Sequence, residues 1–134
     1  MKDIKDYLHL YLGCEVHDFV NDKVGRLFRV STNGVCKVLH SVQWSLHPHE
    51  FKLILRPLSV MTEEEAVFIK RVLRDNHGID TIKTVLQNGW HLGHISANAS
   101  QMFEITRYLL SKSFDLFRLI EAGLAIDATK QPNP

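Results

Sequence analysis

The stretch LHPHEFKLILRPLSVMTEEE, residues 46–65, decides the fold, because the sequence changes there from a strand pattern to a helix pattern. Apolar and polar residues alternate over 50–56, as in a strand with one buried face. Pro57 then fixes its own φ and biases Arg56 toward an extended backbone. We therefore expect a strand to end at this Arg-Pro pair and a helix to begin shortly after it.

Thr62 and Glu65 predict the start of that helix. Their spacing is that of a capping box, in which each side chain accepts a backbone N–H of the other residue. Glu63 and Glu64 add negative charge where the helix dipole is positive. We expect this helix to end at His77-Gly78, and helix electrostatics accounts for the three glutamates without a metal or acid/base site.

Upstream of the junction, short segments rich in Val, Phe, Leu and Trp are separated by Asn21-Asp22, Asn33-Gly34 and His47-Pro48. Such pairs mark turns, and Asn-Gly is typical of two-residue hairpin turns that need positive φ. The expected strands are 14–20, 24–32, 35–41, 42–46 and 50–56. We predict an α+β fold with an SH3-like or curled antiparallel β unit of about four to five strands, followed by a C-terminal helical unit.

The remaining segments complete one domain over residues 1–134. A short N-terminal helix is expected from Ile4 to Leu12, a helix over 80–87, a strong amphipathic helix from Asn98 or Ser100 to Ser113, and a second short helix from Leu116 to Ala122. The domain is expected to have a β-rich subregion at 14–58, a helical subregion at 62–127 and a disordered tail at 128–134.

The chain of 134 residues carries a formal net charge of +1, so no overall field favours nucleic acid or a basic partner. No apolar run is long enough to cross a bilayer, and the first residues do not resemble a secretory signal. We expect a cytoplasmic protein without a membrane partner. Cys14 and Cys36 are expected to be buried reduced thiols.

The eight histidines are the main candidates for chemistry. His47, His49, His91 and His94 could together bind zinc, although surface and turn positions explain them better. Neither cysteine has the setting of a reactive thiol, and the sequence contains no glycine-rich phosphate loop. We assign no catalytic residue and no cofactor, and a histidine-metal hydrolase is kept only as the weakest alternative.

Basic and aromatic residues on the expected strands are the remaining candidates for binding. They are Arg26, Arg29, Lys37, Trp44, Lys52 and Arg56. Small β-barrels bind RNA or single-stranded DNA through cations and stacking rings, and they bind proteins equally often. Ordinary solvated strand faces are the alternative explanation of the same residues.

Four segments of this chain resemble motifs of a group of small uncharacterised proteins of Bacteroidetes phages and prophages. The segments are Tyr11–Cys14, Leu55–Ser59, Thr62–Glu65 and Asp115–Asp127, whereas residues 79–100 lie outside the resemblance. The function of that group is unknown, and the resemblance supplies a gene context but no catalytic residue.

The resemblance implies a non-catalytic accessory protein rather than an enzyme. Its most concrete form would be an inhibitor of a bacterial defence system, such as an anti-CRISPR protein that binds an RNA-guided nuclease complex. The partner would then be a host protein or nucleoprotein complex in the cytoplasm of a bacterial host cell. The alternative is an RNA-binding or single-stranded-DNA-binding module of phage replication or transcription.

Overall fold

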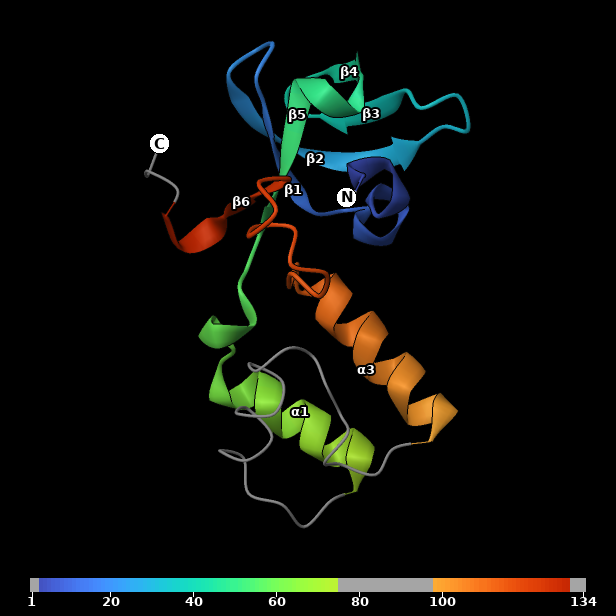
Figure 1. The fold of residues 1–134 in the computed structure, drawn as a ribbon, viewed down its shortest axis with the longest axis vertical. Coiled ribbons are helices and arrows are strands. Elements are labelled where there is room, and N and C mark those ends of the chain that lie inside the picture. Colours follow the sequence, from blue (N-terminus) through green and yellow to red (C-terminus); the bar gives the residue numbers. More distant parts are fainter. Residues whose placement is uncertain (1–2, 75–97, 131–134) are drawn as a thin grey trace.

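The structure is a computed structural model that describes residues 3–74 and 98–130. It is an α+β fold in which a mixed six-stranded sheet lies at one end and the helices α1 (Glu63–Leu73) and α3 (Ala99–Ser111) pack together at the other (Figure 1). The expectation of an α+β fold is confirmed, and the expectation of about four to five strands falls short by one.

The sheet has the strand order β4-β3-β2-β1-β5-β6. Its strands are β1 (Glu15–Asp18), β2 (Lys23–Val30), β3 (Cys36–Leu39), β4 (Gln43–Leu46), β5 (Phe51–Leu55) and β6 (Ala125–Asp127). Neighbouring strands are antiparallel from β4 to β5, whereas β5 and β6 are parallel. The first five strands lie within the ranges that the turn residues predict, except that β2 begins one residue earlier, at Lys23.

The turn between β2 and β3 differs from the two-residue type that Asn33-Gly34 indicates. Only Gly34 has a positive φ, of 89°, whereas the side chain of Asn33 accepts a hydrogen bond from Val35 N at 3.1 Å. Ser31 N also donates to Val35 O at 3.0 Å, which closes a longer loop. The Asn side chain thus stabilises the turn through a local hydrogen bond rather than through a left-handed backbone.

The capping box of α1 is confirmed. Thr62 Oγ1 accepts from Glu65 N at 3.2 Å, and Glu65 Oε1 accepts from Thr62 N at 2.8 Å. The helix α1 ends at Leu73, followed by Arg74 in a left-handed conformation with φ 53°. The expected end at His77-Gly78 and the expected helix 80–87 lie outside the described residues.

Two of the expected α-helices do not form. Residues 4–12 form 3-10 helices at Ile4–Asp6 and Leu8–Tyr11 rather than one α-helix. The segment from Leu116 to Ala122 forms bends and turns, because Asp115 accepts hydrogen bonds from Leu119 N and Ile120 N, both at 2.9 Å. A carboxylate that binds these N–H groups competes with the helical hydrogen bonds they would otherwise make.

The C-terminal part of the chain departs further from the expected helical subregion. Ala125–Asp127 forms β6, and Leu53 of β5 pairs with Ala125. Residues 128–130 form a 3-10 helix rather than a disordered tail, and 131–134 lie outside the described residues. The subregion 62–127 is therefore helical only in part.

Buried side chains form two apolar clusters. One lies between the sheet and the N-terminal 3-10 helices, and the other lies between α1, α3 and the segment after α3. Leu110 and Phe117 pack against both clusters. In the part of the chain that the structure describes, no helix has the length and apolar character needed to span a membrane.

Candidate functional site

One face of the sheet is buried and the other is exposed to solvent. On the buried face, Val16, Leu27, Val38 and Leu53 are completely inaccessible. The opposite side, here called the outer sheet face, carries cations and exposed apolar side chains. Its members are Glu15, His17, Val24, Arg26, Phe28, Arg29, Lys37, Leu39 and Lys52.

A β-bulge shapes the middle of the outer sheet face. Leu27 pairs with Val38, but the next pair is Arg29 with Lys37, so Phe28 is an extra residue in β2. Phe28 is 44% exposed and Arg29 is also exposed. A bulge re-aims side chains locally, and here it leaves an aromatic ring and a guanidinium adjacent on the surface.

Strand register brings most of the expected basic residues together. Arg29 pairs with Lys37, and the Lys37 ammonium donates to Ser45 Oγ on β4. Lys52 pairs with His17 on β1, whose Nε2 lies 3.4 Å from Asp22 Oδ1. These neighbours make a surface in which cations predominate.

Arg26 lies on the same face and opposite Glu15. Its guanidinium donates to Gly13 O at 3.0 Å. Arg29 and Lys52 differ, because among residues 3–74 and 98–130 their side chains make neither an ion pair nor a hydrogen bond. These two are therefore the cations of this face that are least committed to the fold.

Arg56 has a structural role instead. Its guanidinium makes a two-pronged ion pair with Glu65, at 2.7 and 2.8 Å, and lies 4.2 Å from the centre of the Phe114 ring. Burial raises the pKa of Glu65, but the hydrogen bonds from Arg56 and Thr62 outweigh it and hold that pKa below its ordinary value. Arg56 thus joins β5 to the start of α1, and it is not part of the outer sheet face.

Trp44 also lies away from the basic residues. It pairs with Val38, so its ring belongs to the opposite side of β4 from Ser45. It stacks on His40 with the ring centres 5.8 Å apart. The side chain of His40 is 7% exposed and its Nε2 lies 3.2 Å from the buried carboxylate of Asp18.

Asp18 anchors this polar cluster. Its Oδ1 accepts from Val20 N and Asn21 N, at 2.9 and 3.0 Å, and Oδ2 accepts from the Asn21 side chain at 2.6 Å. Burial raises the pKa of Asp18, but the hydrogen bonds from Asn21, His40 and Val20 outweigh it and lower that pKa below its ordinary value. The cluster stabilises the turn after β1, where an ionised carboxylate is fully satisfied.

The histidine candidates are only partly brought together. His47 and His49 stack with ring centres 5.7 Å apart on the 3-10 turn Pro48–Glu50, whereas His91 and His94 lie outside the described residues. Within residues 3–74 and 98–130, no group of three or more His, Cys, Asp or Glu side chains could hold a metal ion. The zinc site stays a prediction that depends on His91 and His94.

Cys14 and Cys36 are buried and unpaired. Burial raises the pKa of both thiols, although the Ser113 hydroxyl, 3.0 Å from Cys14 Sγ, acts in the opposite direction on Cys14. A raised pKa keeps a thiol protonated at neutral pH and makes it a poor nucleophile. These positions agree with packing roles in the apolar cluster under the sheet.

Phe28 is not among the expected binding residues, because alternation alone assigns the neighbouring strand residues Phe28 and Arg29 to opposite faces. Only the register shift places its ring next to Arg29, and such a shift has no local sequence signal. The fold and the surface define an α+β protein with a basic and apolar outer sheet face. Comparisons with protein-family models, curated proteins and solved structures found no match to this chain.

Proposed function

We propose that this chain is a non-catalytic binding protein whose outer sheet face covers a surface of a partner protein or nucleoprotein complex. The observation that carries this proposal is the bulge that exposes Phe28 and Arg29 side by side. Aromatic and arginine side chains provide much of the binding energy at protein interfaces. Val24 and Leu39, exposed at 41% and 47%, extend the apolar part of this surface.

Charge on this face favours an acidic partner surface. Arg29 is free of ion pairs among the described residues, and Lys37 and Lys52 lie on the same side of the sheet. Complementary charge increases association rates and selects among partners more than it increases affinity.

The most concrete form of this function is inhibition of a bacterial defence system in the host cytoplasm. An anti-CRISPR protein that binds an RNA-guided nuclease complex is the example that the resemblance to phage and prophage proteins suggests. The inhibitor would act by occlusion, because covering a surface requires no catalytic residue.

We also propose that β1 to β5 form an SH3-like unit. The support is the strand order β4-β3-β2-β1-β5, in which β1 pairs with both β2 and β5. The one-turn 3-10 helix Pro48–Glu50 carries the chain from β4 to β5. Small barrels of this kind commonly serve as binding modules.

The test is an affinity capture from lysate of a bacterial host, with the tagged full chain and two variants. The double variant Phe28→Ser with Arg29→Glu alters the outer sheet face, and Phe103→Ser removes a ring that is 65% exposed on α3. We expect a partner that is retained by the wild type and Phe103→Ser but lost with the double variant. Equal retention by both variants would contradict the proposed surface.

A single-stranded nucleic acid is the second candidate partner, because an exposed ring beside a guanidinium could stack on a base and contact phosphate. Fluorescence anisotropy with labelled single-stranded RNA and DNA tests this role. Binding should weaken steeply with salt and should fall with Arg29→Glu. Absence of binding at low salt would leave the protein partner as the remaining proposal.

A further inference from the structure

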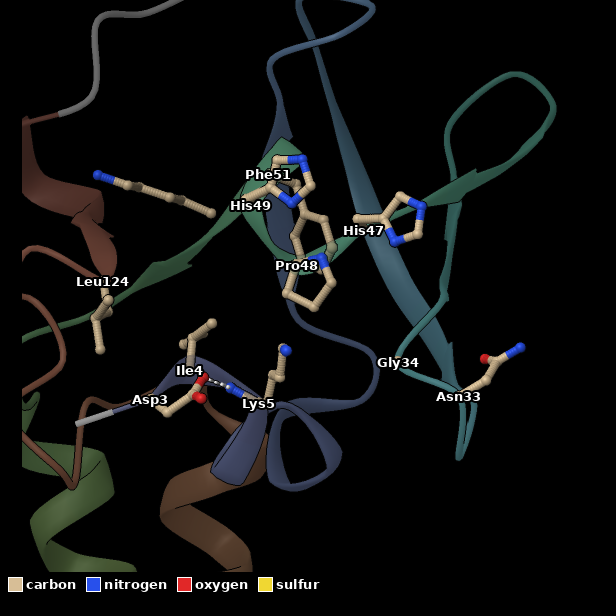
Figure 2. A pocket seen from close by; sticks show the side chains of 11 residues that line it. Asp3, Ile4, Lys5, Asn33, Gly34, His47, Pro48, His49, Phe51 and Leu124 are labelled. Atoms are coloured by element: carbon tan, nitrogen blue, oxygen red, sulfur yellow. Dashed lines mark hydrogen bonds between the residues drawn. The ribbon is translucent and has the colours of Figure 1, made fainter. Parts of the chain in front are cut away.

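A pocket of about 600 Å³ lies beside the turn that connects β4 and β5. Its walls come from separate parts of the chain: the first 3-10 helix, the loop between β2 and β3, the start of β5 and the residue before β6. Figure 2 shows these segments around the cavity. Its volume falls in the range of small-molecule sites in proteins, roughly 300–1,000 Å³.

Part of the pocket lining is apolar. Ile4, Pro48, Phe51 and Leu124 line it, and Phe51 is 3% exposed and belongs to the apolar cluster beneath the sheet. In Figure 2, Ile4 lies below Pro48 and Phe51, and Leu124 lies to the left of them. Such a lining suits a flat organic group.

The polar lining is predominantly basic. It includes Lys5, Lys52, His47 and His49, against the single acid Asp3. Asp3 Oδ1 accepts a hydrogen bond from Lys5 N at 3.0 Å, so this carboxylate caps its own 3-10 turn. No ion pair among the described residues involves either lysine. These ammonium groups remain available to an anion.

The connection between β4 and β5 holds the histidines in position. Glu50 Oε1 accepts from His47 N at 2.8 Å, and Pro48 fixes φ at the first position of the turn. The two imidazole rings stack with an interplanar angle of 12°. A pocket wall that is ordered in advance loses less entropy when a ligand binds.

We propose that this pocket binds a small phosphate ester whose organic part is flat, such as a nucleoside monophosphate. Lysine ammonium groups and imidazole N–H groups supply the donors that a phosphate group requires. The apolar lining accommodates the ring. Phe28 and Arg29 of the protein surface proposed above do not line this pocket, and Lys52 is the residue that belongs both to that surface and to the pocket lining.

The experiment titrates the full chain with AMP, inorganic phosphate and adenosine, and follows the histidine ring signals by NMR. We expect saturable AMP binding with a Kd below about 1 mM, and we expect the NMR signals of the His47 and His49 rings to shift during the titration. AMP should bind more tightly than either phosphate or adenosine, because only AMP uses both the basic and the apolar lining.

Matched variants identify the site. Lys5→Glu should weaken AMP binding about tenfold, whereas Lys23→Glu, an exposed cation that does not line the pocket, should leave it unchanged. His49→Ala should weaken binding, and His9→Ala should not. Thermal denaturation of each variant verifies that it folds.

Three results would overturn the proposal. One is the absence of saturable AMP binding at about 10 mM, where a site of mM affinity would be mostly occupied. Another is equal weakening by Lys5→Glu and Lys23→Glu, which indicates non-specific attraction. The third is adenosine or inorganic phosphate that binds as tightly as AMP, since one half of the lining would then contribute nothing.

Discussion

Asp18 is a buried carboxylate whose acceptor sites are occupied by the turn that follows β1. Both of its oxygens accept hydrogen bonds, and the side chain is inaccessible to solvent. Asp18→Asn would place an N–H₂ group against donors from Asn21 or His40. We expect the free energy of unfolding to fall by about 1–3 kcal/mol in chemical denaturation at neutral pH.

The same carboxylate should make stability depend on acid. Because the folded-state pKa of Asp18 is lowered, its stabilising contribution is fully present above about pH 4 and is lost as pH falls through the lowered pKa. Wild type should therefore lose more stability between pH 6 and pH 3 than Asp18→Asn does. Asp6→Asn, at an exposed position without an ion pair among the described residues, is the control and should follow the wild type.

Arg56 illustrates how a plausible binding residue can belong to the fold. Arg56→Lys would remove the two-pronged contact with Glu65 and the planar contact with Phe114. We expect urea denaturation to show a loss of about 1–3 kcal/mol. Arg29→Lys, which has no ion pair to lose, should change stability by less than about 0.5 kcal/mol. Similar losses in both variants would refute the structural assignment.

The part of the candidate site that follows from the alternation of side chains along a strand could be predicted from the sequence. Alternation places Lys52 on the exposed side of β5, and the structure adds Arg29 and Lys37 as a cross-strand pair. Alternation could not reveal the ion pair between Arg56 and Glu65, because that contact depends on where α1 begins after β5 has ended. Alternation could not reveal that Arg29 lies beside Phe28 either, since the bulge changes which face Arg29 occupies.

At the scale of elements, the segment after α3 shows why apolar spacing overpredicts helix. Asp115 accepts from Phe117 N, Leu119 N and Ile120 N, at 3.3, 2.9 and 2.9 Å. Asp115→Ala should lower the free energy of unfolding by about 1–3 kcal/mol, because these N–H groups lose their acceptor. Glu121→Ala, at an exposed position of the same segment, should have little effect in the same denaturation experiment.

The pairing of β2 with β3 depends on a glycine. A Cβ at position 25 would lie 2.8 Å from the backbone oxygen of Leu39, which no side-chain rotation can relieve. Gly25→Ala should therefore cost about 1–3 kcal/mol of stability. Val24→Ala, at the exposed neighbouring position, is the control. Thermal denaturation measures both, and a Gly25→Ala protein as stable as wild type would contradict this close approach.

The elements that sequence predicts well are those specified locally. The turn residues delimit β1 to β5, and Thr62 with Glu65 fixes the start of α1. The strand β6 has three residues and pairs in parallel with β5, so its existence depends on a partner about seventy positions away along the chain. No periodic pattern can develop over so short a segment.

At the scale of the whole molecule, the segment after α3 joins the sheet to the helices. Tyr11 donates to Phe114 O at 2.8 Å and accepts from Leu116 N at 3.2 Å, both in buried surroundings. Arg56 and Ser113 add a backbone hydrogen bond of 2.8 Å. The two apolar clusters therefore share buried polar contacts as well as the side chains of Leu110 and Phe117.

These shared contacts lead us to expect one cooperative unfolding transition. In a Trp90→Phe background, fluorescence would report on Trp44 of β4 alone, and circular dichroism would report on the helices. The two midpoints should coincide, as they do for a single cooperative unit. Tyr11→Phe should move both midpoints together. It should lower the free energy of unfolding by about 1–3 kcal/mol, because it leaves Leu116 N–H and Phe114 C=O without their buried partner. Separate midpoints in the background protein would mean that the sheet and the helices unfold independently, since the junction at Tyr11 and Phe114 would then be too weak to couple them.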